Sequence, residues 1–232
     1  MPEATPDPVD RPAVWVNCAV SLDGRLAFAG GARARLSSPE DLVRVQRLRA
    51  EADAILVGIG TVLKDDPSLR VHWELIGGAG GREPERVVVD STGRTPERAR
   101  VLDGRVPTTI AVSRRSTRVF SPPIRTIVAG EAEVDLALLF TRLREQGVRR
   151  LLVEGGSQIL GSVLKGTLFD RLTVYYAPAV IGGATAPPMV GGREVRGPSE
   201  LVELETVGVE ALGDGFVATF VPGRVDPTRD LV

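Results

Sequence analysis

A short apolar strand that turns directly into a helix is the feature that most constrains the fold of this chain. Residues 151–153 are apolar, Glu154 ends the run, and Gly155 and Gly156 let the backbone turn without side chains. A helical pattern of apolar residues begins after Ser157. The first N–H groups of a helix have no intrahelical partner and the helix dipole favours negative charge there. The bend therefore suits a nucleotide phosphate, although glycines often serve only to make a turn.

Strand and helix patterns alternate along most of the chain. Strands are predicted at residues 13–19, 54–57, 86–90, 108–113, 125–129, 149–154, 171–177, 201–209 and 215–221. Helices are predicted from the Ser38 cap to about residue 50, at 61–64, at 134–146 and from Ser157 to 165. This order predicts an α/β fold with a mixed, mostly parallel central sheet and a strand-rich C-terminal edge.

The composition is typical of a soluble globular protein, with 43% hydrophobic residues, 25% charged residues and a net charge of −1. That balance gives no basic surface for nucleic acid or for an anionic membrane. A single cysteine, Cys18, excludes an internal disulfide, and with a single histidine, His72, it excludes a Cys/His zinc centre, so no metal is expected.

No apolar run approaches the ~20 residues of a membrane span, and the N-terminus lacks the apolar core of a secretory signal. We therefore expect a cytoplasmic protein. The pattern predicts one domain over residues 12–221 between flexible tails at 1–11 and 222–232.

A second glycine-containing bend follows the strand at residues 54–57. Position 63 is leucine, so the dinucleotide fingerprint G-x-G-x-x-G fails, and no G-x-x-x-x-G-K-[ST] motif is present. Thr61 and Asp65 stand four residues apart on one helical face, where they could hold a ribose or a carboxamide. The same residues could instead form only a capped turn that ends at Asp66 and Pro67.

Several predicted strand segments end at Ser21, Gly58, Asp90, Ser113 and Glu154. Ligands of such sheets bind beyond the carboxyl ends of the strands, so these positions are predicted to share one rim. A serine-hydrolase site is disfavoured, because G-x-S-x-G would need glycine at position 159 and the histidine precedes the serine in the chain.

Taken together, these stretches resemble the stand-alone pyrimidine reductases of riboflavin biosynthesis, which are similar to the reductase half of bacterial bifunctional deaminase–reductases. The matching stretches occur in the family's order, cover about residues 12–221, and lie at 17–25, 49–58, 61–69, 86–91 and 153–157. The zinc deaminase half, with its H-x-E and C-x-x-C, is absent. The resemblance implies a dihydrofolate-reductase-like three-layer fold.

The resemblance also implies NADPH-dependent reduction of a phosphorylated ribosylaminopyrimidine to its ribitylamino product. The implied cofactor-binding residues are Gly58, Thr61, Asp65, Ser91, Gly155, Gly156, Ser157, Gln158 and Ile159. The implied substrate positions are Asn17, Arg35, Arg49, Leu69 and His72, with Glu154 beside them. Arg114 is our own candidate for the 2′-phosphate that distinguishes NADPH from NADH, because arginine binds phosphate through forked hydrogen bonds.

Three positions depart from the bacterial bifunctional type: Asn17 replaces a lysine, His72 an arginine and Arg35 a tryptophan. These departures look like the archaeal and fungal branch, whose substrate is the 2,5-diaminopyrimidinone. Reduction of the deaminated 5-aminouracil, a dihydrofolate-reductase-like activity and a nucleotide-binding sensor remain alternatives.

The reaction implied by the resemblance adds hydride to the imine carbon of an opened ribosylamine. A carboxylate close to the protonated imine nitrogen would stabilise that cation, and Glu154 is the first candidate, with Asp23 behind it. The family also implies a homodimer, for which Tyr175, Tyr176 and residues 180–181 near a sheet edge are the predicted surface.

Overall fold

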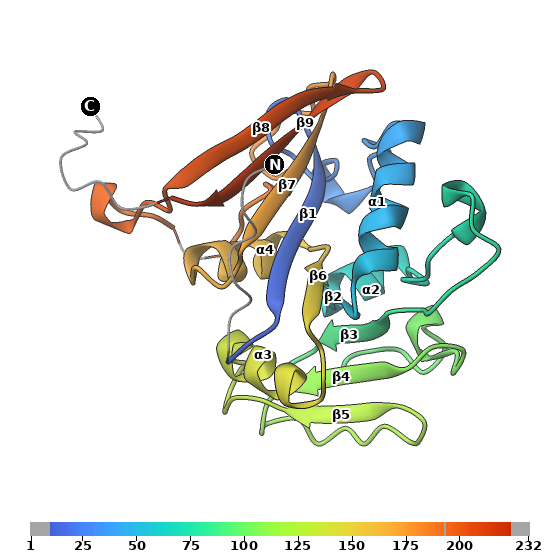
Figure 1. Cartoon of the computed structure of the whole chain (residues 1–232). Helices are drawn as coiled ribbons and strands as arrows, with labels where there is room; N and C mark the ends of the chain where they lie inside the picture. The colour runs from blue at the N-terminus through green and yellow to red at the C-terminus, as the bar shows by residue number, and fades with distance from the viewer. Residues whose placement is uncertain (1–9, 193, 224–232) are drawn as a thin grey trace.

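The computed structural model describes residues 10–192 and 194–223 and places nine strands in one sheet with helices on both faces (Figure 1). The strands are β1 (Ala13–Ser21), β2 (Ala54–Gly58), β3 (Glu85–Val89), β4 (Thr108–Val112), β5 (Arg125–Val128), β6 (Arg150–Val153), β7 (Arg171–Ala177), β8 (Leu204–Leu212) and β9 (Gly215–Pro222). The helices are α1 (Pro39–Glu51), α2 (Ile59–Asp65), α3 (Leu136–Glu145) and α4 (Ser157–Lys165). Short 3-10 turns lie at Ala29–Gly31, Trp73–Ile76, Arg100–Leu102 and Pro198–Glu200.

The sheet has the strand order β5-β4-β3-β2-β6-β1-β7-β9-β8. Every neighbouring pair from β5 to β7 is parallel, whereas β9 runs antiparallel to both β7 and β8. The predicted mostly parallel sheet with a mixed C-terminal edge is therefore confirmed. Because parallel strands share a direction, the carboxyl ends of β1, β2, β3, β4 and β6 all lie on one edge, as the sequence predicted.

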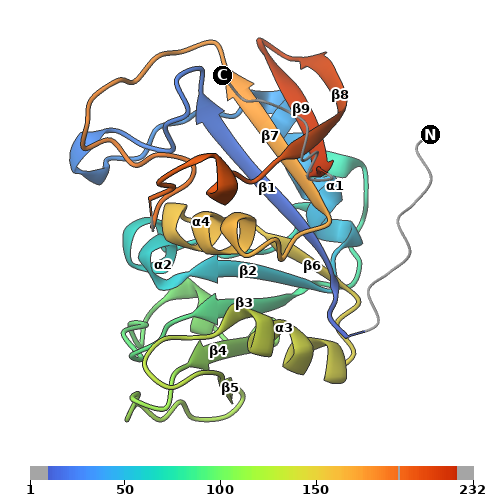
Figure 2. The ribbon, with the colours of Figure 1, turned by 90° about the vertical axis from the view of Figure 1, so that its left-hand side faces the viewer.

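Helices cover both faces of the sheet and make three layers. Figure 2 shows α3 and α4 lying across one face. Their apolar residues, such as Phe140 and Leu160, pack on the side chains of β1, β2, β3 and β6 that point to that face. Residues of α1 and α2, such as Leu48 and Val62, pack with Ile55 and Leu152 on the opposite face. Both faces are covered, so strands such as β2 and β4 are buried at every position.

The start of α1 follows the predicted capping pattern. Ser38 is the N-cap, its Oγ accepts a hydrogen bond from the N–H of Asp41 at 3.2 Å, and Pro39 occupies the first turn. Gly147, predicted to end α3, has a φ of +93° and donates its N–H to Arg144. The predicted cap at Ser38 and stop at Gly147 are therefore confirmed. Such features can be predicted because they depend on backbone geometry within one helical turn.

Two sequence predictions are corrected by long-range packing. The strand expected at 201–209 runs from Leu204 to Leu212, because its hairpin with β9 pairs Leu212 with Gly215 and sets the register. Tyr175 does not lie at an edge; it is fully buried in β7 between β1 and β9.

The tails predicted at residues 1–11 and 222–232 lie mostly outside the described residues. At their inner ends, Arg11 forms two hydrogen bonds with the Asp170 carboxylate, at 2.6 and 2.8 Å, and β9 extends to Pro222. Within the part of the chain that the structure describes, no helix is long and apolar enough to cross a membrane.

Backbone-to-backbone contact fixes α4 against residues 188–192. Gly161 lies in the helix interior, and a Cβ built there would sit 2.1 Å from the carbonyl oxygen of Gly191. In an unobstructed helix, alanine would be about 1 kcal/mol more favourable than glycine. We therefore expect Gly161→Ala to reverse this order and to lower the free energy of unfolding by about 1–3 kcal/mol in urea denaturation.

The matched control is Gly60→Ala in α2, where a Cβ would have no neighbour within 4 Å. That variant should be as stable as the parent or more stable. Equal stabilisation by both alanines would contradict the contact between α4 and Gly191.

Candidate functional site

A cleft of about 950 Å³ lies beyond the carboxyl ends of β1, β2, β3 and β6, between α2 and α4. Its lining contains Glu154 and most of the residues that the sequence predicted for cofactor binding. These residues are Gly58, Thr61, Asp65, Ser91, Glu154, Gly155, Gly156, Ser157, Gln158 and Ile159. The volume and the mixed polar and apolar lining are those of a site for a cofactor or a small molecule.

The two glycine bends lie side by side in the lining of this cleft. The N–H of Gly58 donates to the carbonyl of Gly155 at 2.9 Å, so the end of β2 is tied directly to the turn after β6. A Cβ on Gly58 would lie 2.7 Å from Cγ1 of Ile159, and a Cβ on Gly156 would lie 3.3 Å from Oγ1 of Thr61. The Gly155–Gly156 peptide bond is cis. The absence of side chains therefore lets α2, β2 and α4 approach closely around one cavity.

The N-terminus of α4 is a ready site for an anion. Its N-cap, Gly156, provides no side-chain hydrogen bond, so the amides of Ser157, Gln158 and Ile159 keep free donors that point out of the helix. The Ser157 hydroxyl donates instead to the carbonyl of Pro188 at 2.6 Å. The groups that this bend offers a phosphate are therefore backbone amides rather than the serine hydroxyl.

Glu154 is held at the rim of the cleft by Arg49 from α1. Nε and Nη2 of Arg49 donate to the two carboxylate oxygens, both at 2.7 Å, and Nη1 donates to the carbonyl of Arg70 at 3.0 Å. The two side chains are only 16% and 10% exposed. Burial alone would lower the pKa of Arg49, but the adjacent Glu154 charge outweighs it and the pKa is raised, so Arg49 stays cationic. The paired charges keep the Glu154 carboxylate fixed in one orientation.

Asp23 does not line the cleft. Its carboxylate accepts hydrogen bonds from Oγ of Ser21 at 2.7 Å and from the amides of Ile181 and Gly182 at 3.0 and 2.8 Å. These donors, the Ser21 hydroxyl first, lower the pKa of Asp23 to about 2. The geometry makes Asp23 an anchor between the turn after β1 and the loop after β7, away from the position expected of a catalytic group.

The other predicted substrate residues are also absent from the cleft lining. Asn17 is buried and accepts a hydrogen bond from Arg44 at 2.8 Å, and Leu69 packs in the core below α1 and α2. His72 pairs with Glu74 at 3.1 Å on the surface, and Arg35 is exposed. Of the predicted substrate group, Arg49 is tied to the lining by its two hydrogen bonds to Glu154.

The cation predicted for a 2′-phosphate lies elsewhere too. Arg114 is 70% exposed and pairs with Glu131 at 2.8 Å, outside the cleft. Arg94 and Lys64 are the cationic side chains of the lining. Sequence reasoning missed both, although each stands close to a predicted residue: Arg94 follows Ser91 by three positions and Lys64 precedes Asp65.

A buried carboxylate organises the loop that carries Arg94. Asp90, at the end of β3, accepts hydrogen bonds from the N–H and the Oγ1 of Thr95, both at 2.7 Å. The loop between them contributes Ser91, Thr92 and Arg94 to the cleft. This short loop therefore brings the hydroxyl groups of Ser91 and Thr92 and the guanidinium of Arg94 to the cleft.

The chain is similar to known proteins over most of its length. A model of the RibD C-terminal domain matches residues 12–218. The 2,5-diamino-6-ribosylamino-4(3H)-pyrimidinone 5′-phosphate reductase of Methanothermobacter thermautotrophicus is 42% identical over 219 residues, covering 90% of this chain and 98% of that protein. The protein of the same name from Archaeoglobus fulgidus is 41% identical over 218 residues, covering 90% and 97%.

Among solved structures, the chain is similar to a diaminohydroxyphosphoribosylaminopyrimidine deaminase/5-amino-6-(5-phosphoribosylamino)uracil reductase from Thermotoga maritima. The TM-score is 0.79 at 25% sequence identity, and the match covers 92% of this chain and 57% of that chain. This chain therefore spans a little over half of that two-activity protein.

The single cysteine gives a direct probe of the cleft. Cys18 lines the cleft but is only 6% exposed, and burial raises the pKa of its thiol to about 12. The thiolate is the reactive form, so alkylation of the folded protein at pH 8.5 should be at least about 100-fold slower than in urea. Labelling at equal rates in both conditions would contradict the buried position.

The raised pKa of Cys18 also makes the stability of the fold depend on pH. Above pH 9, the ordinary value for the thiol, the unfolded chain loses the Cys18 proton while the folded chain keeps it up to about pH 12. Stability therefore falls as pH rises through this window, by about 1.4 kcal/mol per pH unit. The parent should show this additional slope in urea denaturation, and Cys18→Ala should lack it.

Proposed function

Because the chain belongs to the RibD C-terminal domain family, we propose that it reduces 2,5-diamino-6-ribosylamino-4(3H)-pyrimidinone 5′-phosphate in riboflavin biosynthesis, with NADPH as hydride donor. The chain is a pyrimidine reductase, an oxidoreductase. The observation that carries the proposal is the cleft in which two glycine bends and the fixed Glu154 carboxylate meet.

The choice of the diamino substrate rests on two independent supports. The two archaeal reductases match this chain over almost their whole length, and their names specify that substrate. The sequence also has Asn17, Arg35 and His72 where the bacterial bifunctional type has other residues. The deaminated pyrimidine and dihydrofolate are the competing substrates.

The residues of the cleft fit a dinucleotide. The free amides at the start of α4 suit its pyrophosphate, and the position of Gly156 next to Thr61 leaves room that a Cβ would occupy. Thr61 and Asp65 follow the second bend on α2 and suit the nicotinamide–ribose end. Ser91, beyond β3, suits the adenosine end. NADPH, when bound, supplies the hydride that the reduction requires.

Glu154 is the residue that we propose to act on the substrate. The opened ribosylamine is an imine; hydride adds to its carbon C1′, and a proton added to its nitrogen leaves a secondary amine. A cationic iminium is stabilised by a fixed carboxylate in a site that excludes water. Arg49 holds the Glu154 carboxylate in place through two hydrogen bonds, so that no reorganisation is needed when the substrate charge develops.

Arg94 is our candidate for the 2′-phosphate of NADPH, in place of Arg114. It belongs to the same loop as Ser91, is exposed to the cleft, and forms no ion pair with any residue in the described ranges. A guanidinium without a partner can bind a phosphate without first breaking a protein contact.

We also propose that the enzyme is a homodimer that pairs through the β8 edge. This strand carries the apolar residues Leu204, Val207 and Val209, and Val209 is 62% exposed. An exposed edge strand has unpaired backbone groups that a second copy can satisfy. Sedimentation that shows only a monomer would exclude this arrangement.

Steady-state kinetics test the substrate and the role of Glu154 together. We expect NADPH oxidation with the diaminopyrimidinone to be at least about 10-fold more efficient than with the deaminated pyrimidine or dihydrofolate. Glu154→Gln keeps the shape but removes the charge, so kcat should fall about 100-fold, the usual effect of losing one electrostatic group. The dissociation constant for NADPH should stay within about 3-fold.

The comparison variant is Asp23→Asn, which tests the competing catalytic assignment. We expect its kcat to change less than that of Glu154→Gln, because Asp23 anchors a loop outside the cleft. A larger loss in Asp23→Asn would reverse the assignment. Tight NADPH binding with no turnover of any of the three substrates would favour a nucleotide sensor.

Cofactor preference tests the Arg94 assignment. Loss of a charge-assisted bond to phosphate is worth about 1.5–3 kcal/mol, so Arg94→Gln should raise KM for NADPH about 10- to 100-fold and leave KM for NADH nearly unchanged. Arg114→Gln is the matched control and should change neither value. The opposite pattern would restore Arg114 as the 2′-phosphate ligand.

A further inference from the structure

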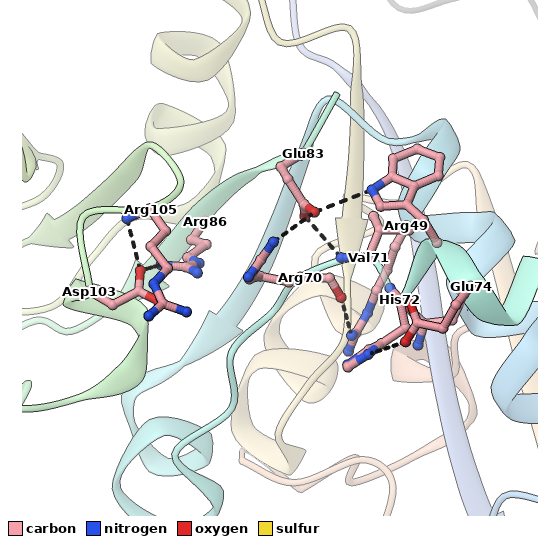
Figure 3. Close-up of polar contacts among 11 residues, drawn as sticks. Arg49, Arg70, Val71, His72, Glu74, Glu83, Arg86, Asp103 and Arg105 are labelled. Carbon is pink, nitrogen blue, oxygen red and sulfur yellow. Dashed lines mark hydrogen bonds and ion pairs between the residues drawn. The ribbon is translucent and has the colours of Figure 1, made fainter. Parts of the chain in front are cut away.

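Glu83 lies in the segment before β3 and binds three groups of residues 70–73. Its carboxylate accepts hydrogen bonds from the N–H of Val71 at 2.9 Å and from Nε1 of Trp73 at 3.3 Å, and it lies 3.6 Å from Nη2 of Arg70 (Figure 3). Glu83 is 17% exposed and does not line the cleft. The carboxylate therefore fixes this segment from outside the cleft lining.

The segment held by Glu83 also holds Arg49. The carbonyl of Arg70 accepts the hydrogen bond from Nη1 of Arg49, which Figure 3 shows beside the Glu83 contacts. The N–H of His72 donates to Oε1 of Gln46 at 2.9 Å, so the segment is also tied to α1, the helix that carries Arg49. Arg49 in turn binds both oxygens of Glu154.

These contacts form one continuous chain from Glu83 to the cleft. A guanidinium is planar, so a bond to its third nitrogen fixes the plane in which the other two meet a carboxylate. The negative charge of Glu83 also favours the cationic form of Arg49, adding to the larger effect of Glu154. Glu83 therefore influences both the orientation and the charge state of Arg49, and Arg49 in turn orients the Glu154 carboxylate.

We propose that Glu83 is a positioning residue for the reduction, which sets the orientation of the Glu154 carboxylate through residues 70–73 and Arg49. The inference rests on the catalytic role proposed for Glu154. A catalytic group that is misplaced by about 1 Å can slow a reaction about 100-fold. Binding of the cofactor, which uses other residues of the cleft, should be unaffected. The loss should therefore fall on kcat.

The chain offers a matched control two residues further on. Glu85 is 13% exposed and is likewise committed to internal partners, accepting from Thr109 and pairing with Arg125. It lies on the side of β4 and β5, away from residues 70–73. Glu85→Gln should therefore carry a similar structural cost without reaching Arg49.

The first measurement follows Arg49 directly. The side-chain Nε–H signal of Arg49 is assigned in the NMR spectrum by its loss in Arg49→Lys. In Glu83→Ala this signal should shift and lose protection from solvent exchange, Glu83→Gln should show an intermediate change, and Glu85→Gln should match the parent. An unchanged Arg49 signal in both Glu83 variants would overturn the inference, whatever the activity.

The second measurement is a double-mutant cycle in kcat. We expect Glu83→Ala to lower kcat about 10-fold with KM for NADPH within about 2-fold, and the same change to have less than about 2-fold effect when Glu154→Gln is already present. Equal losses in both backgrounds would show that Glu83 does not act through Glu154 and would overturn the inference. Glu83→Gln, measured in parallel with its thermal unfolding, decides the same comparison if Glu83→Ala does not fold.

The two proposals fail in different ways. If Glu154→Gln alone leaves kcat unchanged, the catalytic role of Glu154 is lost, while the Arg49 signal still decides whether Glu83 sets its geometry. If Glu154→Gln lowers kcat but the Glu83 variants leave both readouts unchanged, only the positioning role is lost.

Discussion

The carbonyl of Gly155 accepts the N–H of Gly58, and this single backbone contact joins two turns that are almost one hundred residues apart. No side chain separates the turns, so α2 and α4 begin next to each other above the ends of neighbouring strands. A parallel sheet collects strand ends at one edge but does not by itself bring two helix starts into one cavity. The close approach of the glycines does so, and the remaining polar groups of the site are arranged around it.

The charged group of this cavity is held in place by a helix of another layer of the fold. Glu154 follows β6, whereas Arg49 comes from α1, and the two meet as a nearly buried pair. Removing two charges from water is costly unless their hydrogen bonds are satisfied, and here the guanidinium also bonds to the Arg70 carbonyl. The pair is therefore evidence of a fixed anionic group rather than of added stability.

The sequence predicted those parts of the molecule that depend on local periodicity and on strand direction. The parallel order, the Ser38 cap and the glycine bends follow from patterns within about ten residues, and the bends lined the cleft as expected. Long side chains were harder to place. The partners of Arg49 and Asp23 lie more than 100 residues away in the sequence. Leu69 lies in the core and has a φ of +49°, which the sequence pattern does not predict.

The missed residues have a common physical origin. Arg94 is brought to the cleft because Asp90 closes a tight loop with Thr95, and the partner of a buried carboxylate cannot be read from one strand end alone. The affinity of arginine for phosphate predicts Arg114, but Arg114 pairs with Glu131 on the surface. In both cases a neighbouring carboxylate decided which cation reached the cavity.

The loop closed by Asp90 follows β3, whereas Glu154 follows β6, and β2 runs between these two strands. Adjacent strands are about 4.8 Å apart, so the two turns are separated by roughly 10 Å of rigid sheet. Mutations can accumulate in one turn without disturbing the other. The loop at one end of the cavity can therefore vary in sequence while the turn that carries Glu154 keeps its geometry.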